Sequence, residues 1–156
     1  MTPYWDGQAR GAFVGLSGLH GKAHLYRAVL EGLALEQRLI IEGIEATTGQ
    51  HISEIRALGG GSYSRVWCQI LSDVLCRPIH LVNEQESTAL GAGMLAAAAG
   101  GVHADILSAA KNMSGVGHAY QADETKSNAY NDIFDTYKDI YPSLKQTFGK
   151  LAKIRT

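Results

Sequence analysis

The sequence has few of the features that mark secreted, membrane or redox proteins. Among its 156 residues there are two cysteines, Cys68 and Cys76, and no metal-ligand partners lie near them in the sequence. We expect both to stay reduced thiols in a cytoplasmic protein rather than to form a disulfide. No apolar run approaches the ~20 residues that span a bilayer. Residues 1–11 lack the basic start and apolar core of a signal peptide.

An excess of charge of one sign is also missing. The 14 Lys and Arg residues and 15 Asp and Glu residues leave a net charge of −1, which gives no basic footprint for nucleic acid. We therefore expect neither a nucleic-acid nor a membrane partner. The six histidines are scattered, and His20 and His24 have no third ligand nearby, so no metal site is predicted. There is no CxxC pair, no nucleophile elbow and no Walker A lysine.

What the sequence does have is a periodic apolar pattern, with 46% apolar residues. Helical spacing over residues 22–47 ends near Gly49, a plausible left-handed terminator. Residues 54–58, "EIRAL", and 79–82, "IHLV", indicate short buried strands. Between them lies a helix that either Ser62 or Ser64 can cap. Its predicted apolar face carries Val66, Trp67, Ile70, Leu71, Val74 and Leu75. A helix over "STALGAGMLAAAAG" should follow and stop at Gly100–Gly101.

This order of strand, helix, strand and helix predicts parallel strands and an α/β unit. A short helix, "DILSAAKNM", should come next, and then a long amphipathic helix over residues 127–152. We expect Pro142 to kink or interrupt that helix. At helical spacing its aromatic stripe is more typical of a packed face than of a binding surface. The stripe consists of Tyr130, Ile133, Phe134, Tyr137 and Tyr141.

Three consecutive glycines, Gly59, Gly60 and Gly61, join the first strand to the following helix. Glycine permits left-handed backbone and close approach, so the triplet serves either a plain turn or a cradle for a phosphate. A strand that ends in such a turn at a helix N-terminus presents amide donors and a positive dipole end, which suits a phosphate. We expect Gly61→Val to abolish such binding, because a β-branched residue blocks close approach and resists positive φ.

Four phrases in order resemble the FGGY carbohydrate kinases. They are "PYWDGQARGAFVGL", "AHLYRAVLEGLALEQR", "LGGGSYSRVWCQILSDVLCRPI" and "ESTALGAGMLAAAAGG", and the tail at 130–145 also fits. The phrases read closer to xylulokinase-like members than to glycerol kinase. The resemblance implies the C-terminal part of a ribonuclease H-like, actin-like ATPase domain. It also implies that ATP, with Mg²⁺, phosphorylates a sugar or polyol hydroxyl in a cleft.

Carried over residue by residue, the resemblance implies a nucleotide site at the glycine turn. Gly60 and Gly61 match family glycines near the α-phosphate and ribose, and Gly59 precedes them. Ser62 lies at the pocket edge or caps the helix. Arg65 occupies a position where glycerol kinases carry an adenine-contacting asparagine, so it either touches adenine or remains in solvent.

Other matching positions have structural roles. Trp67 is expected in the core, and Gln69 is expected to pin its helix to a neighbouring segment. Glu86 starts a helix, where a carboxylate suits the dipole better than it suits a metal site. Cys76 departs from the glycine usual at this helix end, a departure that can strain the turn.

The family's base aspartate, its Gly-Thr turn and its N-terminal phosphate turn have no match in the chain. Asp6 and Asp73 lie outside the matching motifs and do not replace them. We therefore expect a single domain over residues 1–156, incomplete at its N-terminal side, with Met1 a cloning or gene-truncation start. No catalytic residue and no Mg²⁺ ligand is assigned, and a missing N-terminal domain would bind the sugar.

An open edge on the strand over residues 54–58 predicts a homodimer, unless residues 11–18 fold back to cover it. The alternative function is a non-catalytic interaction module that acts through this edge. A dinucleotide-binding oxidoreductase is disfavoured, because "GGGSYSR" is not G-x-G-x-x-G.

Overall fold

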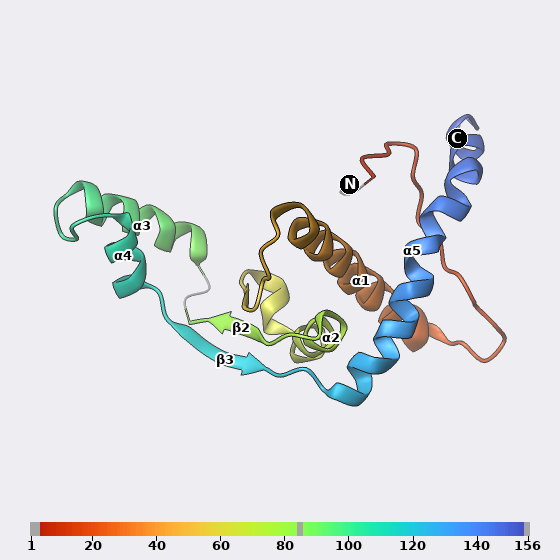
Figure 1. Cartoon of the computed structure of the whole chain (residues 1–156), viewed down its shortest axis with the longest axis horizontal. Helices are drawn as coiled ribbons and strands as arrows, with labels where there is room; N and C mark the ends of the chain where they lie inside the picture. Colours follow the sequence, from red (N-terminus) through yellow and green to blue (C-terminus); the bar gives the residue numbers. More distant parts are fainter. Residues whose placement is uncertain (1–3, 84–85, 155–156) are drawn as a thin grey trace. The chain divides into compact units, whose positions relative to one another are not determined.

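The computed structural model describes residues 4–83 and 86–154, and Figure 1 labels most of its elements. Helices and strands alternate along most of the chain, as the periodicity predicts. In order they are α1 (Lys22–Thr48), β1 (Ile55–Ala57), η1 (Gly60–Tyr63), α2 (Arg65–Leu75), β2 (Ile79–Val82), α3 (Ser87–Ala99), α4 (Ile106–Met113), β3 (Val116–Tyr120) and α5 (Glu124–Ala152).

The chain divides into two compact units. Unit 1 comprises Met1–Ile52, Asp73–Cys76 and Ala122–Thr156, and unit 2 comprises Ser53–Ser72 and Arg77–Gln121. Unit 1 contains α1, the last turn of α2 and α5. Unit 2 contains the three strands named above, the turn η1, most of α2, and the neighbouring helices α3 and α4.

Unit 2 is built on a sheet in the order β1-β2-β3. β1 and β2 are parallel, with Ile55 opposite Ile79, so the predicted parallel pair is confirmed. β3 pairs with β2 in the antiparallel direction, with Ile79 opposite Tyr120 and a bulge between His80 and Val82. β3 was not predicted. The sheet therefore extends beyond the α/β unit that the sequence indicates.

The helix ends follow the glycine signals. The left-handed residue that closes α1 is Gly49, with φ 68°, and its amide donates to Glu45 O at 2.8 Å. α3 ends at Ala99, directly before Gly100, and Glu86 lies at its N-cap position. Each of these boundaries confirms its prediction to within one or two residues.

The face of α2 differs from its predicted pattern. Ile70, Val74 and Leu75 are buried as predicted, but Val66 in the first turn is 60% exposed. Cys68 and Ser72 are fully buried in its place. Cys68 and Cys76 are free thiols, the first buried and the second exposed. Burial raises the pKa of the Cys68 thiol, which keeps it protonated.

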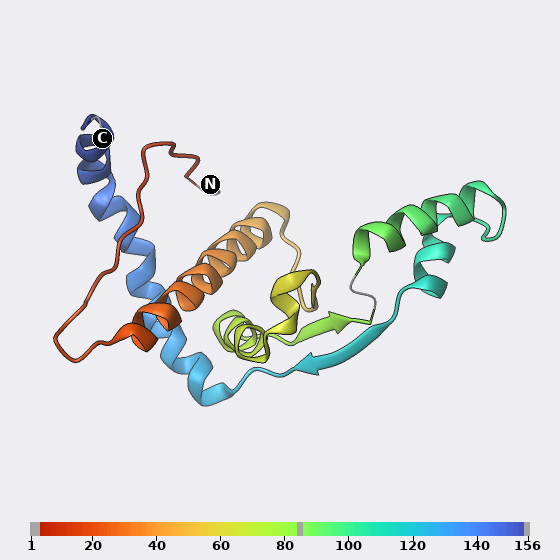
Figure 2. The same ribbon diagram turned by 180° about the vertical axis from the view of Figure 1, so that it is seen from behind.

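The long C-terminal helix begins earlier than predicted and runs through its proline. Asp123 caps α5 by accepting the Lys126 amide at 3.2 Å, so the helix starts at Glu124. Of the two expected effects of Pro142, a kink or an interruption, the interruption is wrong, because α5 continues to Ala152 as one helix (Figure 2). A proline removes one helical hydrogen bond. Aromatic anchors on both sides of it, Tyr137 before and Phe148 after, are hydrogen-bonded or buried and hold the helix together.

In unit 1, α1 and α5 pack against each other (Figure 2). Tyr130 and Phe134 of α5 are buried, which confirms the predicted packed face, whereas Ile133 is 47% exposed. Arg38 of α1 lies 4.3 Å above the Phe134 ring and donates to Val74 O at 3.2 Å.

Asp6 and Asp73, which lie outside the family motifs, have hydrogen-bond partners in unit 1. The buried Asp73 accepts the Asp123 amide at 2.9 Å and so holds the start of α5. Asp6 accepts the Gln8 amide and the Tyr141 hydroxyl, each at 2.8 Å, and these bonds lower its pKa. Within residues 4–83 and 86–154, no helix combines the length and apolar character that crossing a bilayer requires.

Candidate functional site

The glycine triplet forms a tight turn directly after β1. Gly59 adopts φ 80° and ψ −175°, a conformation that is essentially restricted to glycine. Gly60 then begins the 3-10 turn η1, in which the Ser62 amide donates to Gly59 O at 3.0 Å. The turn passes through Ser64 into α2. The chain therefore reverses from strand to helix within a few residues, at the carboxyl end of a parallel strand.

The two glycines that open η1 offer backbone donors. Within the described part of the chain, the amides of Gly60 and Gly61 donate no backbone hydrogen bond. Gly61 is also closely packed: a Cβ there would lie 3.2 Å from Trp67 Nε1. The left-handed φ belongs to Gly59 and not to Gly61, so the expectation that valine at Gly61 would resist a positive φ is corrected. Close packing against Trp67 is the remaining reason why valine should not fit at position 61.

The structure separates the roles of the two serines. Ser64 caps α2, since its Oγ accepts the Trp67 amide at 3.2 Å. Ser62 Oγ instead donates to Gly59 O at 2.7 Å and braces the turn from inside. Ser62 is therefore not the cap, and its hydroxyl lone pairs remain available to accept a hydrogen bond. Trp67, expected in the core, is half-buried.

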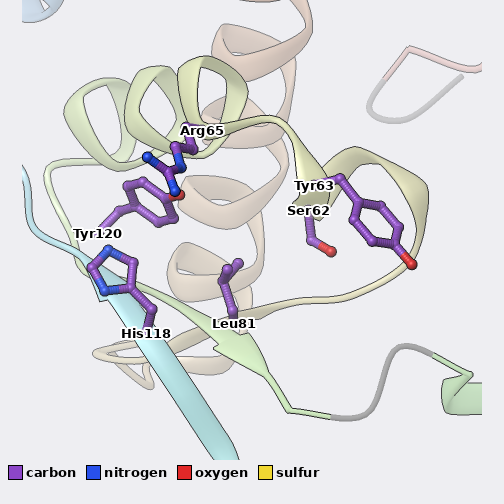
Figure 3. Close-up of a pocket in the computed structure, with 6 residues that line it drawn as sticks. All are labelled: Ser62, Tyr63, Arg65, Leu81, His118 and Tyr120. Atoms are coloured by element: carbon purple, nitrogen blue, oxygen red, sulfur yellow. The ribbon is translucent and has the colours of Figure 1, made fainter.

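An open pocket of ≈ 580 Å³ lies beside this turn, within unit 2 (Figure 3). It is lined by Ser62, Tyr63, Arg65, Leu81, His118 and Tyr120. Two predicted site residues, Ser62 and Arg65, are thus brought together in one pocket. Gly59, Gly60 and Gly61 form the adjacent turn and are not among the lining residues. Arg65 is exposed and carries the charge of the lining.

Sequence reasoning missed Leu81 on β2 and both His118 and Tyr120 on β3. Their signal was weak: "VGHAY" alternates in side-chain size but contains a glycine and spans five residues. β3 is held against α2 by two polar side chains. Gln69 Nε2 donates to Gln121 O at 2.9 Å, which confirms that Gln69 pins its helix to a neighbouring segment. The buried Ser72 Oγ lies 2.9 Å from Tyr120 O.

The lining is suited to an anion with an apolar or aromatic portion. It combines a guanidinium, hydroxyls, an imidazole and an aliphatic side chain, and among the residues that the structure describes no carboxylate lines it. Across residues 4–83 and 86–154, no group of three His, Cys, Asp or Glu side chains is arranged to hold a metal ion. The pocket's chemistry therefore fits a phosphate-bearing organic ligand better than a cation.

Comparison with known proteins places this arrangement in a family. Residues 1–100 match the model of the FGGY family of carbohydrate kinases, C-terminal domain. A xylulose kinase of Staphylococcus epidermidis is 32% identical over 153 residues, which cover 98% of this chain and 31% of the relative.

Solved structures agree. A gluconate kinase from Lactobacillus acidophilus superposes with a TM-score of 0.84 at 29% identity, over 94% of this chain and 30% of its own. A xylulose kinase from the same organism gives 0.84 at 28% identity, over 96% of this chain and 30% of its own. The predicted fold class, the C-terminal part of an actin-like ATPase domain, is confirmed. The chain spans about a third of the length of these relatives. It belongs to the FGGY family of carbohydrate kinases, matching that family's C-terminal domain.

Proposed function

We propose that this chain is the ATP-binding C-terminal part of a sugar or polyol kinase, which transfers the γ-phosphate of ATP to a carbohydrate hydroxyl. The observation that carries the proposal is the pocket beside the glycine turn, lined by Ser62 and Arg65 at the carboxyl end of β1. Relatives over almost the whole chain are named as xylulose kinases. Ligands of open α/β sheets bind outside the carboxyl ends of parallel strands.

The residues at the turn would divide the work of holding a nucleotide. The amides of Gly60 and Gly61, which donate no backbone hydrogen bond within the described residues, are donors of the kind that bind phosphate oxygens. Gly59 supplies the backbone conformation that the turn requires. Ser62 presents acceptor lone pairs, and the planar guanidinium of Arg65 can stack on a base or pair with a phosphate.

Binding can be measured by tryptophan fluorescence, because Trp67 lies beside Gly61. In a Trp5→Phe background Trp67 is the remaining tryptophan, so its fluorescence reports on the turn. We expect ATP to change this signal and NAD to leave it unchanged, with an ATP dissociation constant that reaches the millimolar range. A response to NAD with none to ATP would contradict the proposal.

Variants locate the site on the turn. Gly61→Val should abolish the ATP response measured by calorimetry, because a Cβ at this position already lies 3.2 Å from Trp67 Nε1 and valine adds two methyl groups beside the turn. Arg65→Ala should weaken it, whereas Arg56→Ala on β1, an exposed arginine outside the pocket, should not. Unchanged binding in Gly61→Val would move the site elsewhere.

Catalysis requires groups around the transferred phosphate and Mg²⁺. The described residues do not fit a protein-ligated Mg²⁺ site, since no cluster of metal-ligating side chains is present among them and no carboxylate lines the pocket. We therefore expect no sugar-dependent ATP turnover by the 156 residues alone. A coupled ADP-release assay over pentuloses, hexuloses and polyols tests this, and turnover above ~1 s⁻¹ would overturn it.

A second candidate is a homodimer or interaction module formed through β1. In the described sheet β1 lies at the edge and pairs with β2. An open strand edge invites pairing with another strand. Light scattering at several concentrations should then show a dimer that Ala57→Lys splits, and a monomer mass at high concentration would contradict this.

A cytoplasmic location stays a prediction.

A further inference from the structure

We propose that His118 and Tyr120 on β3 hold the base of the nucleotide, so that the base lies toward β3 and the phosphates lie toward the glycine turn. This inference rests on the nucleotide-binding function proposed above and extends it to residues outside the glycine turn. It assigns the base to an aromatic pair and gives the bound nucleotide a direction.

The two rings lie on one face of the sheet together with the aliphatic floor of the pocket. Ile79 is opposite Tyr120, and His80 is opposite Ala119. Because side chains alternate along a strand, Leu81, His118 and Tyr120 share one face and His80 lies on the other. The rings of His118 and Tyr120 meet edge to face, with centroids 4.7 Å apart and planes at 88°. They form a fixed aromatic corner.

The His118 and Tyr120 rings are positioned through the backbone of β3 rather than through their own polar atoms. Ser72 and Gln69 of α2 hold the carbonyls of Tyr120 and Gln121. The Asn83 side chain packs over Gly117, where a Cβ would come 2.5 Å from Asn83 Oδ1. Within the described residues, the His118 ring nitrogens and the Tyr120 hydroxyl make no hydrogen bond. The rings are held in place while their own polar edges remain available to a ligand.

The pocket separates two kinds of chemistry (Figure 3). In this view Arg65, Tyr120 and His118 are grouped on one side, Ser62 and Tyr63 lie on the other, and Leu81 lies between. The first group offers flat rings and a guanidinium plane, which stack on nucleobases. The second continues the turn of Gly60 and Gly61, whose amides suit phosphate because they donate no backbone hydrogen bond within the described residues. A nucleotide laid across Leu81 satisfies both sides in one orientation.

Nuclear magnetic resonance on the full 156-residue chain distinguishes the two ends. ATP should shift the amides of Gly59–Gly61 and also the His118 ring signals. Inorganic tripolyphosphate, which has no base, should shift the glycine amides and leave the His118 ring unchanged.

Variants test stacking directly. His118→Ala should weaken ATP binding about tenfold, the effect expected for the loss of one base–aromatic contact. His118→Phe keeps a flat ring and should stay within about threefold of the unaltered chain, whereas a hydrogen-bonding role would not survive it. Tyr120→Leu should behave like His118→Ala. Tripolyphosphate affinity should be the same in all of these, and His80→Ala, on the opposite face, should match the unaltered chain.

The outcomes separate this inference from the proposed function. If neither ATP nor tripolyphosphate shifts Gly59–Gly61, the nucleotide-binding function fails. If ATP shifts the glycine amides but His118→Ala and Tyr120→Leu bind it as well as the unaltered chain does, the function stands and the base assignment is wrong. An equal loss for ATP and tripolyphosphate would assign the corner to phosphate and would also overturn the inference.

Discussion

The aromatic side chains of unit 1 and those of the pocket in unit 2 differ in what their polar atoms do. On α5, the hydroxyls of Tyr130, Tyr137 and Tyr141 each donate to a carboxylate at 2.8 Å. The carboxylates belong to Glu31, Glu36 and Asp6 respectively. These hydroxyls are engaged in the structure, and the tyrosines that carry them join α5 to α1 and to the N-terminal segment.

In the pocket the opposite holds. Within the described part of the chain, the side-chain polar atoms of Tyr63, His118 and Tyr120 make no hydrogen bond. Buried polar groups need partners, whereas groups that meet a ligand are left open to it. From this contrast we propose that the three tyrosines of α5 serve stability and that the aromatic residues of the pocket serve recognition. Changes in the first set should alter unfolding, and changes in the second should alter binding.

The largest expected effect is on the buried ring of α5. Phe134 is 2% exposed, so Phe134→Ala should lower the free energy of unfolding by about 3–5 kcal/mol. Tyr63 of the pocket is 64% exposed, and Tyr63→Ala should stay within about 0.5 kcal/mol. Urea unfolding followed by circular dichroism measures both. Equal losses in the two variants would break the distinction between the units.

A smaller effect is expected where a hydroxyl faces a carboxylate. Tyr137→Phe removes the bond to Glu36 Oε2 and should lower the free energy of unfolding by about 1.5 kcal/mol, as for hydrogen bonds to charged groups. Tyr120→Phe, which removes a hydroxyl without a partner in the described residues, should cost less than about 0.5 kcal/mol. Urea midpoints at neutral pH compare the two, and a cost at Tyr120 equal to that at Tyr137 would contradict the contrast.

The same tyrosine predicts a pH dependence. Burial first, and then the hydrogen bond to Glu36, raise the pKa of Tyr137 above its ordinary value of 10.0. Between the pKa of this tyrosine in the unfolded chain and its higher pKa in the folded chain, the unfolded chain binds fewer protons at the group. The free energy of unfolding therefore falls as pH rises. Its contribution is fully present below about pH 10. The free energy of unfolding should therefore fall less steeply above that pH in Tyr137→Phe, and identical slopes would refute this.

Much of the fold follows from local patterns in the sequence. The end of α1 at Gly49, the parallel pair of β1 and β2, and the end of α3 depend on apolar periodicity and on glycine. The signals for the helix ends lie within a few residues of those ends, and the parallel pair follows from the order of strand, helix and strand. The continuity of α5 through Pro142 does not follow locally, because packing on both sides of the proline overrides the lost hydrogen bond.

Only part of the candidate site could be predicted from local sequence patterns. Ser62 and Arg65 lie in a family motif and could be named from the sequence. His118 and Tyr120 could not, since they reach the pocket through antiparallel pairing of β3 with a strand more than thirty residues earlier. Val66 was assigned to the core by spacing alone, yet the first turn of α2 is exposed beside the glycine turn. Pairing between distant segments carries no local signal.

The smallest effect concerns the left-handed residues of the two units. In unit 2 the residue directly before η1 has a positive φ and is a glycine, Gly59. In unit 1 the residue directly after α2 also has a positive φ, 53°, but is Cys76. The Arg77 amide donates to Ser72 O at 3.2 Å, the outer bond of a Schellman turn, which requires the left-handed residue between them. A residue with a Cβ in this conformation costs about 1 kcal/mol. The positive φ of Cys76 therefore agrees with the strain that the sequence predicts at this turn.

Cys76→Gly should therefore raise the free energy of unfolding by about 1 kcal/mol relative to Cys76→Ala, less the greater freedom that glycine gives the unfolded chain. Cys76→Ala is the matched control, because it removes the weak sulfur contacts, 3.7 Å to Asn131 Oδ1 among them, and keeps the strained Cβ. Thermal unfolding should show Cys76→Gly melting above Cys76→Ala, by less than the about 2–4 °C that a full 1 kcal/mol would give. If glycine melts below alanine, packing around the Cβ outweighs backbone strain at this turn, and the conformation would then be stabilised by the side chain rather than tolerated despite it.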